Sequence, residues 1–258
     1  MMNKMKVLMA GSALGAAMLA GPALAETTGT VAVTSEYMFR GVVSEGGAAV
    51  QGSLDWSDPS GWYAGAWASN SNPAGGNELD LYGGYTFTLT EGAEADLGLV
   101  WYIFSEDEEV TFPGIDTDLD YWEIYAGVTV GGFGAKLYYA DNYFNVEDNV
   151  IGAVAVAADP TVATDGDAIY LTLNYDWVIK EGLDLNFQIG HSTGDGVERF
   201  LRGGGSADDD YTDWSIALTK ALDNGFSASF AYVQTDIEAG AFDDDPKFVV
   251  TLAKGFEI

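Results

Sequence analysis

The only histidine of the chain, His191, is the first candidate for chemistry. It continues an alternating series of apolar residues, and Thr193 lies two positions further on the same face of the predicted strand. Lipid hydrolases of the outer membrane can carry a histidine and a serine at this spacing, with an acid such as Asp210 on the next strand. Threonine is a poor nucleophile without a special activator, and Ser192 points to the opposite face. We therefore predict no catalytic residue and no enzyme, with a lipid hydrolase as the least favoured alternative.

Metal and cofactor sites are also not expected. The run DTDLDYWE at 116–123 has Asp-x-Asp-x-Asp spacing, but it lacks the glycine at position 6 and the glutamate at position 12 of an EF-hand loop. The glycines at 203–205 are not predicted to precede a helix, so they do not form a phosphate-binding loop. The absence of cysteine excludes thiol and zinc-thiolate chemistry.

The first 25 residues have the pattern of a secretory signal peptide. Lys4 and Lys6 precede an apolar segment over 7–21, and Ala23-Leu24-Ala25 is a small-x-small cleavage site. We predict cleavage after Ala25 and one exported domain over 26–258.

The exported chain is strongly acidic. Without the two signal lysines, 8 basic residues remain against 40 acidic ones, which gives a net charge of −32. Nucleic acid is excluded as a partner, because phosphate binding depends mainly on Lys and Arg. The apolar content of 48% and aromatic content of 13% indicate a folded protein.

Alternation of apolar with polar or small residues recurs in segments of about ten residues. The expected strands cover 30–40, 48–57, 61–70, 78–89, 94–105, 119–130, 133–143, 167–178, 183–193, 211–221, 226–236 and 246–256. Short connections, at 58–61, 90–93, 131–132 and 223–225, alternate with long ones, at 41–47, 71–77, 106–118, 144–166, 194–210 and 237–245. This is the pattern of an all-β, closed antiparallel up-and-down transmembrane β-barrel of about 12 strands, with short periplasmic turns and long extracellular loops.

A soluble lipocalin-like barrel has the same period, so other features must decide which medium the apolar face meets. The polar face has little lysine, whereas soluble surfaces usually mix both charge signs. Aromatic residues gather at both strand ends, as in membrane-interface girdles: Trp56, Trp62, Trp177, Phe226 and Phe256 at the short-turn end, and Tyr37, Phe39, Trp101, Trp122, Tyr139 and Trp214 toward the long loops. A sheet in hydrocarbon must close, so the last segment is predicted to pair with the first, and Lys254 to reach the periplasmic headgroups.

Several segments resemble the TorF family, whose members are assigned as porins. They are VTSEYMFRGV (33–42), YAGAWASN (63–70), ELDLYGGY (78–85), DYWEIYAGV (120–128), AKLYYADNY (135–143), YTDWSIALTK (211–220) and FVVTLAKGF (248–256). The resemblance covers nearly all of the exported chain and implies an outer-membrane barrel of a Gram-negative bacterium. Its members usually end at the aromatic residue, whereas this chain continues with Glu257 and Ile258.

Strand parity assigns a set of polar residues to the barrel interior. The predicted lumen-lining residues are Glu36, Arg40, Gln51, Asp55, Asp80, Asp96, Glu123, Lys136, Asn174, Asp176, Asp184, Asn186, Gln188 and Asp213. Such carboxylates favour cations and repel anions. We therefore predict a porin-like channel for passive diffusion of small hydrophilic solutes or ions, with a cation preference. The alternative is a structural barrel in which Arg40 and Lys136 pair with Glu36, Glu123 and neighbouring acids to fill the interior.

The partners expected from this assignment are outer-membrane lipid and lipopolysaccharide, the barrel-assembly machinery, and small solutes or cations. No cofactor is predicted.

Overall fold

A computed structural model describes residues 25–43, 47–71, 76–105, 118–238, 240 and 245–258. The predicted signal peptide over 1–25 lies almost entirely outside the described residues.

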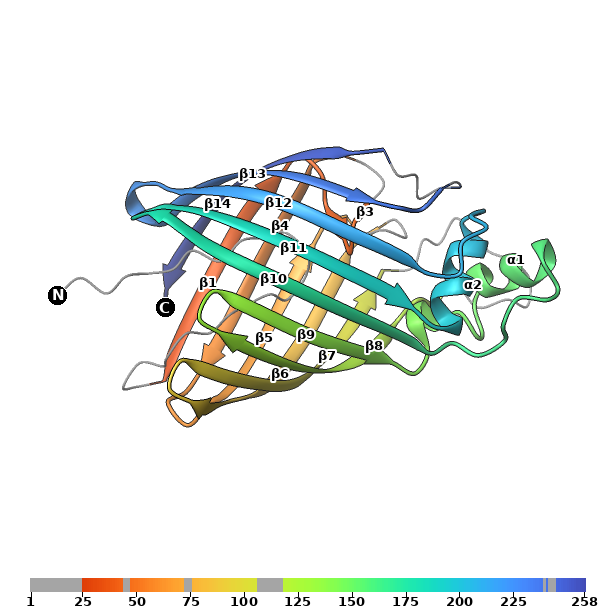
Figure 1. The fold of residues 1–258 in the computed structure, drawn as a ribbon, viewed down its shortest axis with the longest axis horizontal. Coiled ribbons are helices and arrows are strands. Elements are labelled where there is room, and N and C mark those ends of the chain that lie inside the picture. The colour runs from red at the N-terminus through yellow and green to blue at the C-terminus, as the bar shows by residue number, and fades with distance from the viewer. Residues whose placement is uncertain (1–24, 44–46, 72–75, 106–117, 239, 241–244) are drawn as a thin grey trace.

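Twelve antiparallel strands form a closed barrel, which confirms the predicted fold class (Figure 1). The strands are β1 (Glu26–Thr34), β4 (Ala49–Ser57), β5 (Trp62–Ser69), β6 (Glu78–Thr90), β7 (Ala93–Phe104), β8 (Tyr121–Val130), β9 (Phe133–Ala140), β10 (Ala168–Lys180), β11 (Leu183–Thr193), β12 (Tyr211–Ala221), β13 (Phe226–Thr235) and β14 (Lys247–Glu257). The last strand closes the barrel on the first, with Val33 opposite Leu252 and Gly29 opposite Phe256. Closure leaves the wall without a free edge.

The apolar parity of the strands points outward. Val33, Leu97, Leu173 and Phe230 are each about half exposed, and similar side chains occur on every strand of the wall. Alternation is the cause, because successive side chains of a strand point to opposite faces of the sheet. Lys254 lies on this outer face, with its Nζ 4.7 Å from the ring centroid of Phe226 near the short turns.

Inside the barrel, tyrosine rings lie over glycines of neighbouring strands. A Cβ at Gly84 would lie 2.6 Å from Cζ of Tyr63, and a Cβ at Gly98 would lie 2.5 Å from Cζ of Tyr125. Glycine is required at these two positions because any side chain would displace the ring.

The first predicted strand is wrong in its bounds. It was expected over 30–40, but β1 ends at Thr34, and the chain then forms a separate hairpin of β2 (Met38–Phe39) and β3 (Val42–Val43). Arg40 and Gly41 form its turn with φ values of 47° and 79°, as a two-residue turn requires. Tyr37 and Phe39 were expected in the outer aromatic belt, but each is only 4% exposed inside the barrel.

Two long connections contain helices that the strand pattern did not indicate. These are α1 (Val150–Ala158), preceded by the one-turn helix η1 (Tyr143–Asn145), and α2 (Asp195–Gly203). The glycines at 203–205 therefore lie at the C-terminal end of a helix. A further single turn, η2 (Asp223–Gly225), joins β12 to β13. Among the described residues, no helix is long and apolar enough to cross a membrane.

The barrel has two different ends. Figure 1 shows α1 and α2 at one end, here called the loop end, and the C-terminus at the other, here called the turn end. Short connections join β6 to β7 and β8 to β9 at the turn end. The division between short and long connections therefore matches the predicted plan.

Candidate functional site: the interior of the barrel

The half of the lumen toward the loop end is filled. Each of the twelve strands contributes at least one inward side chain to this level that is less than 10% exposed. In chain order from β1 and β4 through β14, these include Thr34, Gln51, Ser69, Asp80, Tyr102, Glu123, Tyr138, Tyr170, Ser192, Asp213, Thr235 and Val249. Water therefore does not reach the wall at this level.

The hairpin β2–β3 is the element that fills it. Arg40 at its tip pairs with Glu123 on β8, with Nη2 2.5 Å from Oε2. A Cβ on Gly41 would lie 2.6 Å from Cβ of Asp213 on β12. Met38 packs in a small cluster with Val233 and Val249. The hairpin thus contacts walls that are far apart around the barrel.

Arg40 is held by charge and by aromatic rings. Its guanidinium carbon lies 4.3 Å from the ring centroid of Tyr170 and 5.3 Å from that of Tyr138, distances at which cation–π attraction is effective. The hydroxyl of Tyr102 donates to Oε2 of Glu123 over 3.1 Å. Burial alone would lower the pKa of Arg40, but the carboxylate of Glu123 together with the surrounding tyrosines raises that pKa well above its usual value. Arg40 is therefore a buried, charged anchor.

Two further carboxyl groups lie beside the hairpin without a cation. Glu78 and Asp80 share the inward face of β6 and are 2% and 0% exposed. The hydroxyl of Tyr37 donates to Oε1 of Glu78 over 3.2 Å. In the part of the chain that the structure describes, no donor reaches either carboxylate oxygen of Asp80. The two carboxyl groups lie within hydrogen-bonding reach of each other.

Aromatic residues of the long connections cover the hairpin from outside. Phe144 of η1 stacks on Phe200 of α2 with ring centroids 4.7 Å apart, and it meets Phe39 edge-on at 5.9 Å. Burial raises the pKa of Tyr143 well above its usual value, so its hydroxyl stays neutral there. These aromatic residues of η1 and α2 are here called the cap. The cap and the hairpin belong to one hydrophobic cluster.

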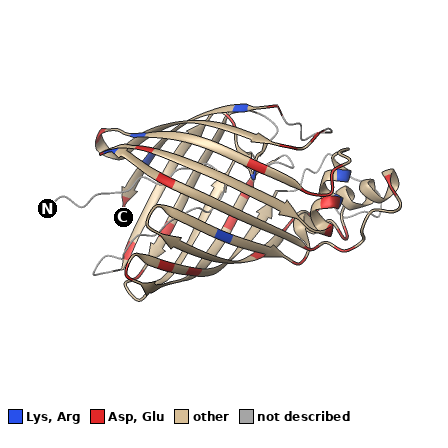
Figure 2. Cartoon of the chain, in the orientation of Figure 1, with Lys and Arg blue, Asp and Glu red and all other residues tan. Residues whose placement is uncertain are grey.

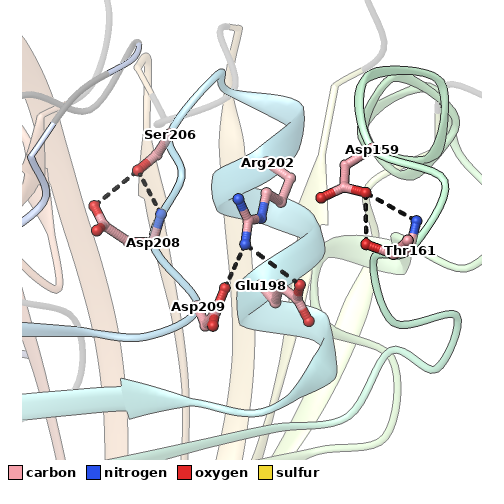
Figure 3. Close-up of polar contacts among 7 residues, drawn as sticks. All are labelled: Asp159, Thr161, Glu198, Arg202, Ser206, Asp208 and Asp209. Carbon is pink, nitrogen blue, oxygen red and sulfur yellow. Dashed lines mark hydrogen bonds and ion pairs between the residues drawn. The ribbon is translucent and has the colours of Figure 1, made fainter.

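Polar contacts fix the cap at its rim (Figure 3). Arg202 contacts Oδ1 of Asp209 at 2.6 Å and Oε1 of Glu198 at 3.7 Å. Thr161 donates to Asp159 through its hydroxyl and its backbone N–H, and these hydrogen bonds lower the pKa of Asp159. Exposed pairs of this kind orient loops and contribute little stability.

The half of the lumen toward the turn end is different, because water reaches many of its polar side chains. Nζ of Lys136 lies 2.8 Å from Oδ2 of Asp96, and the hydroxyl of Tyr63 donates to Oδ1 of Asp96 over 2.6 Å. On the adjacent strands β10 and β11, Nδ2 of Asn186 donates to Oδ1 of Asp176 over 2.8 Å. Figure 2 shows acidic positions along the strands and few basic ones.

The predicted interior residues fall into two groups. Arg40, Gln51, Asp80, Glu123 and Asp213 are buried at the level of the hairpin. Water reaches Asp55, Asp96, Lys136, Asn174, Asp176, Asp184, Asn186 and Gln188. Glu36 lies in the segment after β1, half-buried, and is not on a strand. Whether these residues line a conducting path stays a prediction.

Sequence reasoning missed Glu78 and the inward tyrosines at 63, 82, 102, 125, 138 and 170. Parity could have found them, because Glu78 shares the face of Asp80 and the tyrosines alternate with outward residues. Their polar hydroxyl groups allow tyrosines to face a wet interior as well as a membrane interface.

The sites examined for other chemistry lie apart. His191 is exposed on the outer face, with Nδ1 3.2 Å from Oγ1 of Thr212, whereas Ser192 is buried inside. Oδ1 of Asp118 accepts from the backbone of Asp120, whose own Oδ1 accepts from that of Phe104. Within the described ranges, no three acidic, cysteine or histidine residues are grouped to hold a metal ion; residues 116 and 117 of the acidic run lie outside these ranges.

Comparison with known proteins gives the fold and the family. No curated protein matches the chain. The NanC porin is 11% identical over 89% of this chain and 100% of its own, with a TM-score of 0.58. The KdgM porin is 9% identical over 88% of this chain and 99% of its own, with a TM-score of 0.55. At these identities the likeness shows a shared barrel fold. The model of a family described as bacterial proteins of unknown function, Gcw_chp, matches residues 19–256, and the chain belongs to that family.

Proposed function

We propose that this protein is a porin-like channel of the outer membrane, through which small hydrophilic solutes or ions diffuse passively. The observation that carries the proposal is that the lumen is filled by an inserted hairpin and the aromatic residues that cover it, and not by the wall itself. The β2–β3 pair forms its own two-stranded sheet, while every wall strand is bonded to two other wall strands. Removing the hairpin would therefore leave the barrel closed and its interior wide enough for water.

The membrane assignment rests on the outer surface. Large apolar side chains are exposed all round the wall, far beyond the patches usual on a soluble protein. In this proposal these exposed apolar side chains face the lipid and lipopolysaccharide of a Gram-negative outer membrane. The signal peptide would direct export, and the barrel-assembly machinery would insert the chain. The resemblance to the TorF porins supports the same assignment.

A preference for cations is part of the proposal. The water-accessible interior carries Asp55, Asp96, Asp176 and Asp184, and Lys136 is already paired with Asp96. An acidic path concentrates cations and repels anions. One solved relative by fold is the KdgM porin in complex with disordered oligogalacturonate, 8% identical with a TM-score of 0.56. Oligogalacturonate is a polyanion, and the acidic interior of this chain does not suit such a solute.

Planar-bilayer conductance tests the function most directly. The refolded exported chain is compared with a variant in which residues 35–48 are replaced by a short Gly-Ser turn that joins β1 to β4. We expect discrete steps from the variant, and a reversal potential in a salt gradient that shows cation preference. An intact barrel is verified by its heat-dependent mobility in detergent gels.

A structural, non-conducting barrel is the second candidate, since the buried hairpin and its aromatic cap fill half of the lumen. It would be established if the hairpin-replaced variant folds but passes no current. The non-enzymatic assignment has a separate test. Detergent-dependent lipase activity that is lost on His191→Ala would overturn it.

A further inference from the structure

We propose that the β2–β3 hairpin is a displaceable gate, and that the carboxyl pair of Glu78 and Asp80 is its proton-sensitive seat. The hairpin is seated when the pair holds a shared proton, and it leaves the lumen when that proton is lost. This inference rests on the proposed channel function and adds to it a closed state, an open state and the signal between them.

The hairpin is attached to the wall by side chains. Its strands are two residues long each, and they pair only with each other. Its polar contacts with the wall include the Arg40–Glu123 ion pair and the Tyr37–Glu78 hydrogen bond. Its packing contacts include Met38 with Val249, Phe39 with Tyr102 and Arg40 with Tyr170. No ladder of backbone hydrogen bonds has to break for the hairpin to move. Its displacement therefore costs far less than opening the barrel.

The backbone of the tip is also strained. Arg40 has a φ of 47°, in a region that favours glycine and asparagine and that a long side chain rarely adopts. Such a conformation persists only where the surroundings enforce it. Here the ion pair with Glu123 and the surrounding rings enforce it, so the strain would be released when the hairpin leaves.

The charges beside the seated hairpin do not balance. The cation at the hairpin tip, Arg40, is already paired with Glu123, with Nη2 2.5 Å from Oε2. Among the described residues, no Lys or Arg forms an ion pair with Glu78 or Asp80. Two ionised carboxylates, buried side by side without a cation, would be strongly destabilising. A proton shared between them removes one charge and supplies the donor that the oxygens of Asp80 lack.

The other ionisable groups that face the pair do not replace that proton. They are Tyr37 ahead of β2, Arg40 at the hairpin tip, Tyr82 on β6, Tyr102 on β7 and Glu123 on β8. The tyrosines are neutral and the two charged groups neutralise each other. The net charge at the seat therefore depends on the pair itself.

The direction in which pH shifts the gate follows from the linkage between protonation of the pair and the position of the hairpin. The seated hairpin excludes water from the pair, whereas its departure hydrates both carboxyl groups and lets both ionise. The closed state thus binds one proton more than the open state, so a falling pH favours closure and a rising pH favours opening. For one released proton, the ratio of open to closed channels changes by at most about tenfold per pH unit.

The test is single-channel recording of the refolded exported chain from mildly acidic to mildly alkaline pH. The wild-type open probability should rise with pH, with a slope up to that limit. Asp80→Asn leaves the seat with at most the single negative charge of the protonated pair at any pH, so this variant should stay closed across the range. Asp223→Asn makes the same chemical change in the exposed short turn between β12 and β13, outside the lumen, and should follow the wild type.

A crosslink keeps the test decisive if Asp80→Asn fails to fold. The chain has no cysteine, so Met38→Cys and Val249→Cys can be joined specifically by a short, cleavable bifunctional reagent. The joined protein should stay closed at every pH, and cleavage should restore the response.

Three outcomes would overturn the gate: a wild-type open probability that is independent of pH, opening of Asp80→Asn at alkaline pH, or equal conduction with and without the crosslink. The hairpin-replaced variant separates this result from the channel function. If it conducts, the channel stands and only the gate fails; if it folds without conducting, the channel itself fails.

Discussion

At the scale of single residues, the Arg40–Glu123 pair is the contact on which the filled lumen depends most. Both side chains are almost fully buried, and removing one partner of such a pair leaves an uncompensated charge that costs about 3–5 kcal/mol. We expect Arg40→Ala to destabilise the folded protein by about that amount in urea titrations from lipid vesicles. The double variant Arg40→Ala/Glu123→Ala should recover part of the loss. Additive losses would show that the two side chains are not coupled.

Gly98 provides a second test at this scale. A Cβ there would lie within 2.5 Å of the ring of Tyr125, so Gly98→Val should lower the free energy of unfolding by about 1–3 kcal/mol through overpacking. Equilibrium unfolding followed by tryptophan fluorescence measures it. Adding Tyr125→Ala should recover part of the loss, because the backbone oxygen of Gly83 still lies 2.7 Å from that Cβ. If the loss is undiminished without the ring, the packing of tyrosine over glycine is not its cause.

At the scale of elements, the short helices close the mouth through a cluster of aromatic contacts centred on Phe144 and Phe200. Phe200 of α2 stacks on Phe144 and is 3% exposed. Truncation of a buried phenylalanine costs about 3 kcal/mol or more, so Phe200→Ala should raise amide hydrogen exchange across α1 and α2 about a hundredfold while that of the wall strands stays unchanged. Val154 on α1 is 45% exposed, and Val154→Ala is the matched control. Equal effects of the two changes would mean that the stacking does not hold the cap.

At the scale of the whole molecule, the barrel has an apolar outer face and an inner face that the hairpin partly fills. Trp122 is 49% exposed on the outer face, whereas Trp67 packs inside against Tyr37 with ring centroids 5.4 Å apart. Brominated lipids quench tryptophans that they touch. In single-tryptophan variants reconstituted in such lipids, we expect strong quenching of Trp122 and weak quenching of Trp67. The reverse order would contradict the assignment of faces.

Much of the wall could be predicted from the sequence because its signals are local. The strand over 183–193 was predicted with its observed bounds, and the strand over 211–221 likewise. Each of these strands has one apolar and one polar face. Only one orientation of the strand therefore places both faces in the medium that suits them. Helix α1 was missed because its Ala-rich segment carries weak helical periodicity. Helix α2 is amphipathic but only 9 residues long, and its aromatic contacts come from distant segments.

The interior was predicted only in part. Parity placed Asp96 and Lys136 inside, and they form an ion pair there. It also placed Tyr37 and Phe39 outside, where they are not. An alternating pattern predicts which side chains share a face of a strand. It does not predict where the chain leaves the barrel wall. The turn at Arg40 and Gly41 was the local signal of that change.

The closed barrel, the outward direction of its apolar face and the acidity of its interior could all be predicted without coordinates, because each depends on neighbours two residues apart or on composition. The entry of the hairpin into the lumen could be seen only in the folded chain. Its position depends on Glu123, Asp213 and Val249 meeting at one level of the barrel. Those residues lie on three strands far apart in the chain, and only closure of the wall brings them around Arg40.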